Sequence, residues 1–156
     1  MAPTMIEPFV IHEGTIDEAY AVYAAIPEFA PTQRVAREEF QTRLADGSRL
    51  VLIASSGESP VAFKAGYDRY RDGSWYSWLG GVLPSHRGLR LAERLIETQE
   101  AWVREHGYRR LFVKTRNRFR AMHALLVRSG YMVVSVDAPD GGGELADLRL
   151  MMVKEL

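Results

Sequence analysis

The sequence predicts an α+β fold in which a mixed, mostly antiparallel sheet is flanked by four helices. Segments with the two-residue period of strands and segments with the 3.6-residue period of helices follow one another in the order β-α-α-β-β-β-α-β-α-β-β. No internal repeat or interdomain linker interrupts them, and 156 residues of which 47% are hydrophobic are enough to bury one core. We therefore expect residues 1–156 to form a single domain.

The first part of the chain is expected to hold one strand and two helices, followed by three strands. Residues 9–11 form a short apolar run typical of a strand. The run Thr15-Ile16-Asp17-Glu18 has the form of a capping box, which predicts a helix that begins here and ends near Pro27. A second helix is predicted over residues 32–44, with Asp46-Gly47 as its stop signal. The three strands are expected, between turn-rich segments, at residues 50–54, 61–70 and 75–83.

In the second part of the chain, helices and strands alternate. The helical period begins at Leu89, and Gly107 ends that helix. A strand is expected at residues 111–115, and a further helix over residues 118–128 with Asn117 as its N-terminal cap. The chain is then expected to close with a strand at residues 131–136, a flexible glycine turn at residues 141–143 and a last strand from Leu148 onward.

The composition excludes several classes of function. The 20 acidic and 20 basic side chains balance, so no global field favours a nucleic acid, an anionic membrane or a polyanionic substrate. The chain has no cysteine, which excludes disulfides, thiolate metal ligands and an acyl-cysteine intermediate. The N-terminus lacks the charged and apolar regions of a signal peptide, and no apolar run reaches membrane-spanning length. We therefore expect a cytoplasmic protein.

The most informative segment is residues 80–95, where a strand ends, a short loop turns and a helix begins. The first turn of a helix carries backbone N–H groups without intrahelical partners, and the helix dipole adds about half a positive charge there. This geometry binds anions such as pyrophosphate. Gly88 permits close approach of the backbone, and Arg87 and Arg90 are expected to donate charge-assisted hydrogen bonds to phosphate oxygens.

The pattern Val82-x-Pro84-x-x-Arg87-Gly88-x-x-x-Ala92 resembles the acyl-CoA loop of the GNAT superfamily of N-acetyltransferases. Further along, Lys114-Thr115-Arg116-Asn117, a helix and Gly130-Tyr131 resemble the family's next strand, asparagine, helix and Gly-aromatic pair. Arg90 stands where the family has its second glycine, and helical backbone angles would tolerate this side chain if it points away from the ligand. The resemblance implies the three-layer GNAT fold, acetyl-CoA as co-substrate and acetyl transfer to a primary amine.

The resemblance also implies how acetyl-CoA is held and attacked. Backbone groups of residues 81–83 would bind the pantetheine arm, in a cleft between the strands at residues 75–83 and 111–115. Asn117 would hold the cofactor or the acetyl end from the other side. The amine would attack the thioester directly while backbone N–H groups near Val82 polarise the carbonyl. The residues expected to bind the cofactor are Gly81, Val82, Leu83, Arg87, Gly88, Leu89, Arg90, Leu91, Ala92 and Asn117.

Three residues are candidates for proton transfer. In many relatives a tyrosine four residues before the Gly-aromatic pair protonates the leaving thiolate, and Leu126 occupies that place here. His123 lies three residues earlier on the same helical face and is a candidate to replace it, as are water and the substrate itself. Glu28, in the loop after the first helix, and Tyr76, on a strand, are candidate bases.

Each candidate also has an ordinary structural interpretation. His123 fits a packed or exposed helix histidine, and Glu28 fits a solvated loop acid. Strand alternation requires about half of Trp75, Tyr76 and Trp78 to face the core. A basic cluster suggests nucleic-acid binding or contact with the 3′-phosphate of coenzyme A, and net neutrality favours the second. The cluster consists of Arg109, Arg110, Lys114, Arg116, Arg118 and Arg120.

The expected partner is a small-molecule or peptide amine, without a membrane or a nucleic acid, and family members often pair as homodimers. No metal is expected, because the four histidines lack helical ligand spacing with carboxylates. Two alternatives to an enzyme stay open. Arg90 and Leu126 motivate a non-catalytic acyl-CoA-binding module, and the basic cluster motivates a nucleic-acid-binding regulator.

Overall fold

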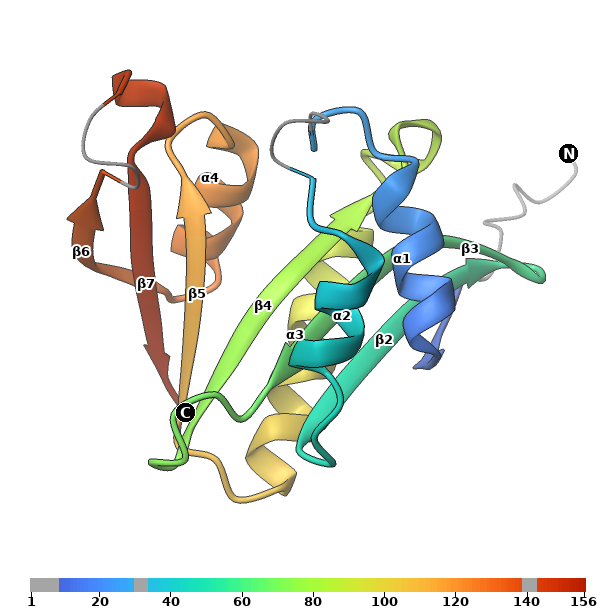
Figure 1. The fold of residues 1–156 in the computed structure, drawn as a ribbon, viewed down its shortest axis with the longest axis horizontal. Helices are drawn as coiled ribbons and strands as arrows, with labels where there is room; N and C mark the ends of the chain where they lie inside the picture. The colour runs from blue at the N-terminus through green and yellow to red at the C-terminus, as the bar shows by residue number, and fades with distance from the viewer. Residues whose placement is uncertain (1–8, 30–33, 139–142) are drawn as a thin grey trace, which may run out of the picture. The chain divides into compact units, whose positions relative to one another are not determined.

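The computed structural model describes residues 9–29, 34–138 and 143–156, and its elements follow the predicted order (Figure 1). The strands are β1 (Phe9–Glu13), β2 (Arg49–Ser56), β3 (Ser59–Tyr67), β4 (Ser74–Val82), β5 (Arg110–Arg116), β6 (Met132–Asp137) and β7 (Arg149–Glu155). The helices are α1 (Ile16–Ala24), α2 (Arg37–Arg43), α3 (Leu91–Glu105) and α4 (Arg120–Arg128), with short 3₁₀ helices η2 (Pro84–His86) and η4 (Leu145–Asp147). None of the helices in these ranges combines the length and apolar character needed to cross a membrane.

The sheet is mostly antiparallel, as predicted, with seven strands in the order β1-β2-β3-β4-β5-β7-β6. β1 pairs antiparallel with β2, and β7 pairs antiparallel with both β5 and β6. β4 and β5 are parallel, and their ladder joins Ser74 to Arg110 at one end and Ser77 to Val113 at the other. Residues 78–82 of β4 extend past this ladder.

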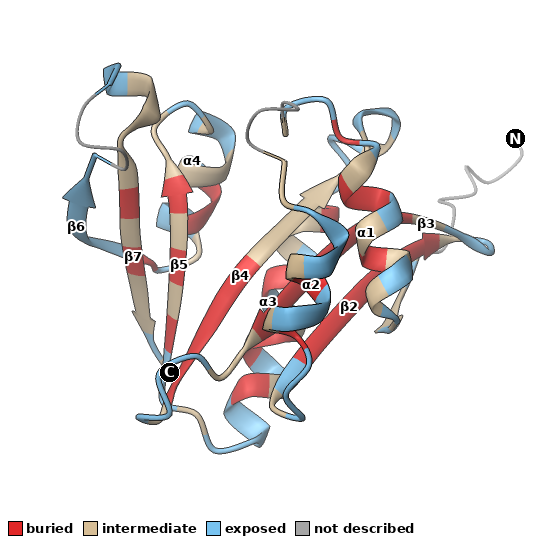
Figure 2. Cartoon of the chain, viewed as in Figure 1, coloured by how far each residue is buried: buried red, intermediate tan, exposed pale blue. Residues whose placement is uncertain are grey.

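The chain divides into two compact units, the first of which carries the α1 and α2 helices. It contains the described residues up to Ala65 together with Leu79–Gln99. Its core is aromatic: Tyr23 of α1, Phe40 of α2 and Phe63 of β3 pack with ring centroids 5.2, 6.3 and 6.4 Å apart. β2 is buried along most of its length (Figure 2). Burial of these large apolar surfaces stabilises the unit.

The second unit contains Gly66–Trp78 and Glu100–Leu156. The ring of Trp75, fully buried, lies 5.1 Å from that of Trp102. A largely buried polar cluster connects α3, β7 and the residue before β6: the Tyr131 hydroxyl donates to Glu100 at 3.1 Å, and the Lys154 ammonium donates to the same carboxylate at 2.8 Å. Burial raises the pKa of Tyr131 well above its ordinary value, so this hydroxyl remains a donor.

The N-terminus of α1 is the element that the sequence specifies best. The Thr15 hydroxyl accepts the Glu18 N–H at 3.1 Å, and the Glu18 carboxylate accepts the Thr15 N–H at 3.0 Å. This reciprocal pair is the predicted capping box. The predicted turn at residues 141–143 lies, except for Gly143, outside the described residues.

The second helix is shorter than predicted, because α2 begins at Arg37 and not at residue 32. Residues 32 and 33 lie outside the described part of the chain. The N–H of Val35 donates to the Tyr23 hydroxyl at 2.7 Å, and Ala36 is extended, with a ψ of 154°. This tertiary hydrogen bond ties Val35 to α1, and because Ala36 is still extended, the helix begins only at Arg37.

The prediction that Asn117 caps α4 is wrong. α4 begins at Arg120, and its N-cap is Phe119, whose side chain makes no capping hydrogen bond. Asn117 instead donates from its side chain to the carbonyl of Leu145 at 3.0 Å and from its backbone N–H to the carbonyl of Leu148 at 2.9 Å. These bonds tie the loop after β5 to η4, so the polar groups of Asn117 serve a long-range contact and not the helix start.

Candidate functional site

The loop that follows α1 packs closely against the C-terminal end of β4. A Cβ atom on Gly81 would lie 2.5 Å from Cδ1 of Ile26 and 3.4 Å from Cε2 of Phe29. Ile26 is itself buried, so its side chain has little space to move into. Glycine is therefore required at a position that the sequence analysis assigned to cofactor binding, and the reason is this close approach.

Between β4 and α3 the chain turns within a few residues. The N–H of Leu83 donates to the carbonyl of Val61 at 2.9 Å, and η2 follows. Gly88 and Arg90 then take left-handed backbone conformations, with φ of +80° and +62°. Leu89, between them, is exposed. The loop thus leads directly into the first turn of α3.

The start of α3 offers unpaired backbone donors. The carbonyl of Arg90 accepts the N–H of Arg94 at 3.0 Å, which places Arg90 immediately before the first helical residue. Among the described residues, no acceptor is found for the backbone N–H groups of Leu91, Ala92 and Glu93. Together with the dipole of a 15-residue helix, these donors can bind an anion.

The expectation of helical backbone angles at Arg90 is wrong, because its φ of +62° lies in the left-handed region. That conformation costs an L-residue about 1–2 kcal/mol, and glycine adopts it without this cost. The glycine that the family pattern expects here therefore matches the backbone of this chain better than arginine does.

We expect Arg90→Gly to be more stable than Arg90→Ala by about 1 kcal/mol. Both variants remove the guanidinium and the aliphatic part of the side chain. Only glycine relieves the strain of the left-handed backbone conformation at φ +62°. Chemical denaturation of the two variants measures the difference in their free energies of unfolding. A more stable alanine variant, or two equal ones, would contradict a strained backbone at this position.

The Arg87 side chain is held by Glu28, which lies 59 residues earlier. Its Nη1 and Nη2 donate to the two carboxylate oxygens at 2.7 and 2.6 Å, and its Nε donates to the carbonyl of Val82 at 3.3 Å. The hydrogen bond from Arg87 lowers the pKa of Glu28, and the same bond raises the pKa of Arg87. The structure thus pairs Arg87, the predicted phosphate ligand, with Glu28, a predicted base, although nothing in the sequence links the two residues.

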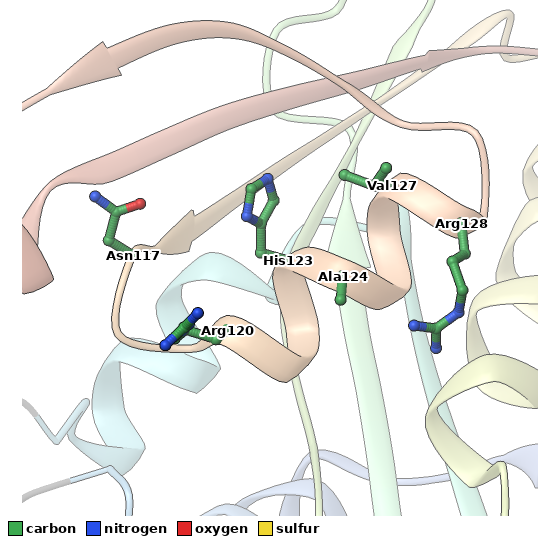
Figure 3. A pocket seen from close by; sticks show the side chains of 6 residues that line it. All are labelled: Asn117, Arg120, His123, Ala124, Val127 and Arg128. Atoms are coloured by element: carbon green, nitrogen blue, oxygen red, sulfur yellow. The ribbon is translucent and has the colours of Figure 1, made fainter.

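The second unit carries a hollow along α4, with a volume of about 620 Å³ (Figure 3). It brings together two predicted site residues, Asn117 and His123. His123 is partly exposed, whereas Leu126, in the place of the family's tyrosine, is fully buried. The complete lining, with two arginines that make it basic, is Asn117, Arg120, His123, Ala124, Val127 and Arg128.

Tyr76, the third catalytic candidate, is buried between cations. The Arg69 guanidinium lies 5.1 Å and the Lys114 ammonium 5.5 Å from the centre of its ring, and the Tyr67 ring lies 5.6 Å away. Its neighbour Trp75 faces the other side of the strand, toward α3. Trp75, Tyr76 and Trp78 are all buried, so the expectation that only about half of them face the core is wrong. Cation–π contacts stabilise the Tyr76 ring.

Two members of the basic cluster are neutralised by acids. Arg110 pairs with Glu155, and Arg118 pairs with Asp147. These pairs lower the positive charge that the cluster can offer to any phosphate ligand. Within the described ranges, no group of three or more metal-ligating side chains comes together.

Comparisons with known proteins bear on the family and the fold of the chain. The model of the Acetyltransferase (GNAT) family matches residues 16–131. No curated protein matches the sequence. Among solved structures, the IAA acetyltransferase from Bacillus cereus ATCC 14579 is 16% identical with a TM-score of 0.77, over 96% of this chain and 100% of that one.

The names of two other similar structures mention an acceptor or coenzyme A. The ribosomal-protein-S18-alanine N-acetyltransferase from Escherichia coli is 14% identical with a TM-score of 0.81, over 95% of this chain and 94% of that one. An aminoglycoside 6′-N-acetyltransferase complexed with coenzyme A is 16% identical with a TM-score of 0.74, over 94% of this chain and 96% of that one. At these identities the similarity shows a shared fold.

Proposed function

Because the chain belongs to the acetyltransferase (GNAT) family, we propose that it transfers the acetyl group of acetyl-CoA to a primary amine by direct attack in a ternary complex. The observation that carries this proposal is the row of unpaired backbone N–H groups at Leu91, Ala92 and Glu93. A pyrophosphate is the anion of coenzyme A that such a helix start would bind. The similar structures named for S18-alanine and aminoglycoside N-acetylation support an amine as the acceptor.

The residues proposed to hold acetyl-CoA lie mostly in the first unit. Backbone groups of residues 81–83 would bind the pantetheine arm, and residues 87–92 would bind the pyrophosphate. Asn117 is proposed as a further contact. Its side-chain NH2 group already donates once to Leu145, which leaves its second N–H and the carbonyl oxygen of the amide for a ligand.

The proposed chemistry forms a bond between the amine nitrogen and the acetyl carbon and breaks the bond from that carbon to sulfur. Backbone N–H groups near Val82 would stabilise the charge that develops on the carbonyl oxygen. A base, Glu28 or Tyr76, would take the proton from the ammonium group, and His123 would protonate the leaving thiolate. Because the thioester is already activated, positioning supplies much of the rate acceleration.

The test is release of coenzyme A from acetyl-CoA in the presence of a panel of small-molecule and peptide amines. A thiol reagent is a clean detector here, because the chain has no cysteine of its own. We expect release that depends on at least one amine and an acetylated product of that amine in the mass spectrum. Binding of acetyl-CoA without release for any amine would favour the non-catalytic acyl-CoA-binding alternative.

Once this assay has identified an acceptor amine, His123→Ala is expected to lower kcat for that amine by roughly 100-fold, the lower end of the range for a general acid. Steady-state kinetics of both proteins measure the effect. His106→Ala, which removes an exposed histidine immediately after α3, is the control, and a wild-type kcat in His123→Ala would remove His123 from the mechanism.

A further inference from the structure

The hydrogen bonds of Arg87 occupy all three nitrogens of its guanidinium group. Nη1 and Nη2 face the Glu28 carboxylate at 2.7 and 2.6 Å, and Nε reaches the Val82 carbonyl at 3.3 Å. A planar guanidinium presents two edges to bidentate acceptors, Nη1–Nη2 and Nε–Nη2. Glu28 takes the first edge, and the Val82 carbonyl takes the Nε–H of the second. Carboxylate and phosphate are both acceptors of this kind, so one edge cannot serve both at once.

Both contacts of Arg87 coincide with the proposed cofactor site. Glu28 binds the Nη1–Nη2 edge of Arg87, which a phosphate would also take. The Nε–H group donates to the Val82 carbonyl, which belongs to the backbone proposed for the pantetheine arm. The two side chains are 45% and 44% exposed, so the ion pair is open to solvent and weak enough to exchange.

The backbone on both sides of Glu28 is held in place, which limits how far this side chain can follow Arg87. Ile26 packs on Gly81, and the Arg34 guanidinium donates to the carbonyl of Phe29 at 3.0 Å and to that of Ile26 at 3.5 Å. A departure of Arg87 would therefore leave the Glu28 carboxylate on the same loop and without its cation.

We propose that Glu28 is a positioning residue that competes with coenzyme A for Arg87, so that binding of the cofactor opens the ion pair and leaves the Glu28 carboxylate unpaired. The inference rests on the proposed function, because it takes the pyrophosphate to bind beside Arg87. A bound cofactor would therefore leave an unpaired carboxylate at Glu28, which is also a candidate for the catalytic base.

The experiment is calorimetric titration of coenzyme A into the wild type, Glu28→Gln, Arg87→Ala and the double variant. Glutamine keeps the shape of glutamate but removes the charge that holds Arg87. We expect Glu28→Gln to lower the Kd about 1.4- to 5-fold, the range set by an exposed ion pair. In the Arg87→Ala background the same substitution should leave the Kd unchanged.

Other results would overturn the competition. An equal or higher Kd in Glu28→Gln would mean that Arg87 keeps or needs Glu28 while the cofactor is bound. If Glu28→Gln lowered the Kd equally in the Arg87→Ala background, the removed negative charge would act at long range and not through Arg87. Asp137→Asn, which breaks the bidentate pair of Asp137 with Arg149 in the second unit, controls for loss of a charge and should leave the Kd unchanged.

The same titration distinguishes failure of this inference from failure of the proposed function. Binding to the wild type with an equal Kd in Glu28→Gln would overturn only the competition for Arg87. No binding of coenzyme A to any of the four proteins would overturn the proposed function and the competition with it. Circular dichroism spectra of the variants verify that each protein is folded.

Discussion

Replacing Arg87 by alanine is expected to weaken acetyl-CoA binding about 2- to 100-fold. A hydrogen bond to a charged group contributes about 1.5–3 kcal/mol. Arg87 must first give up its exposed pair with Glu28, which offsets about 0.2–1 kcal/mol of that gain. The difference, about 0.5–2.8 kcal/mol, corresponds to the stated range in Kd. Calorimetric titration of acetyl-CoA into the two proteins measures it.

The matched control for this prediction is Arg37→Ala. Arg37 forms an exposed ion pair with Asp17 at the other end of α1, so its removal changes the net charge by the same amount. We expect its Kd to equal that of the wild type. An Arg87→Ala variant that binds as tightly as this control would show that Arg87 serves only as the partner of Glu28.

The elements of the fold were predictable because they depend on neighbours in the sequence. The capping box at Thr15 is closed by Glu18, three residues away, and both hydrogen bonds form as expected. The start of α3 is likewise a local property, set by the change from an extended strand to a helical period. What such signals predict well is the order of elements and, to within two residues, the start of α3, which was expected at Leu89 and lies at Leu91.

The features that the sequence did not reveal depend on residues far apart. Glu28 and Arg87 are separated by 59 positions, and no spacing rule pairs an acid with one arginine among many. Asn117 has the residue type of a helix cap, yet Leu145 offers its side chain a carbonyl 28 positions away. In both cases the tertiary partner decides which of several chemically suitable contacts a polar side chain makes.

The left-handed φ of Arg90 was missed for a different reason. Arginine gives no local signal for this conformation, whereas the glycine of the family pattern would have indicated it. The departure from the pattern was visible in the sequence, but its interpretation required the backbone angle. A residue that replaces an expected glycine is thus a reason to test for strain, as the pair Arg90→Gly and Arg90→Ala does.

Gly81→Ala is expected to destabilise the protein by about 1–3 kcal/mol, the usual cost of overpacking a buried contact. The new Cβ would lie 2.5 Å from Cδ1 of Ile26, which is buried and cannot swing away. The loop that carries Glu28 would have to move off β4, so the affinity for acetyl-CoA should fall as well. Chemical denaturation and calorimetric titration measure the two effects.

Two further variants test whether that one contact is the cause. Ile26→Val removes Cδ1, the atom that the new Cβ would meet, so in its background Gly81→Ala should cost clearly less than in the wild type. Gly47→Ala is the matched control, because a Cβ there meets nothing within 4 Å and its effect should stay within about 1 kcal/mol. If Gly81→Ala were as mild as Gly47→Ala, the loop would not be held by β4, and the fixed position of Glu28 would lose its structural basis.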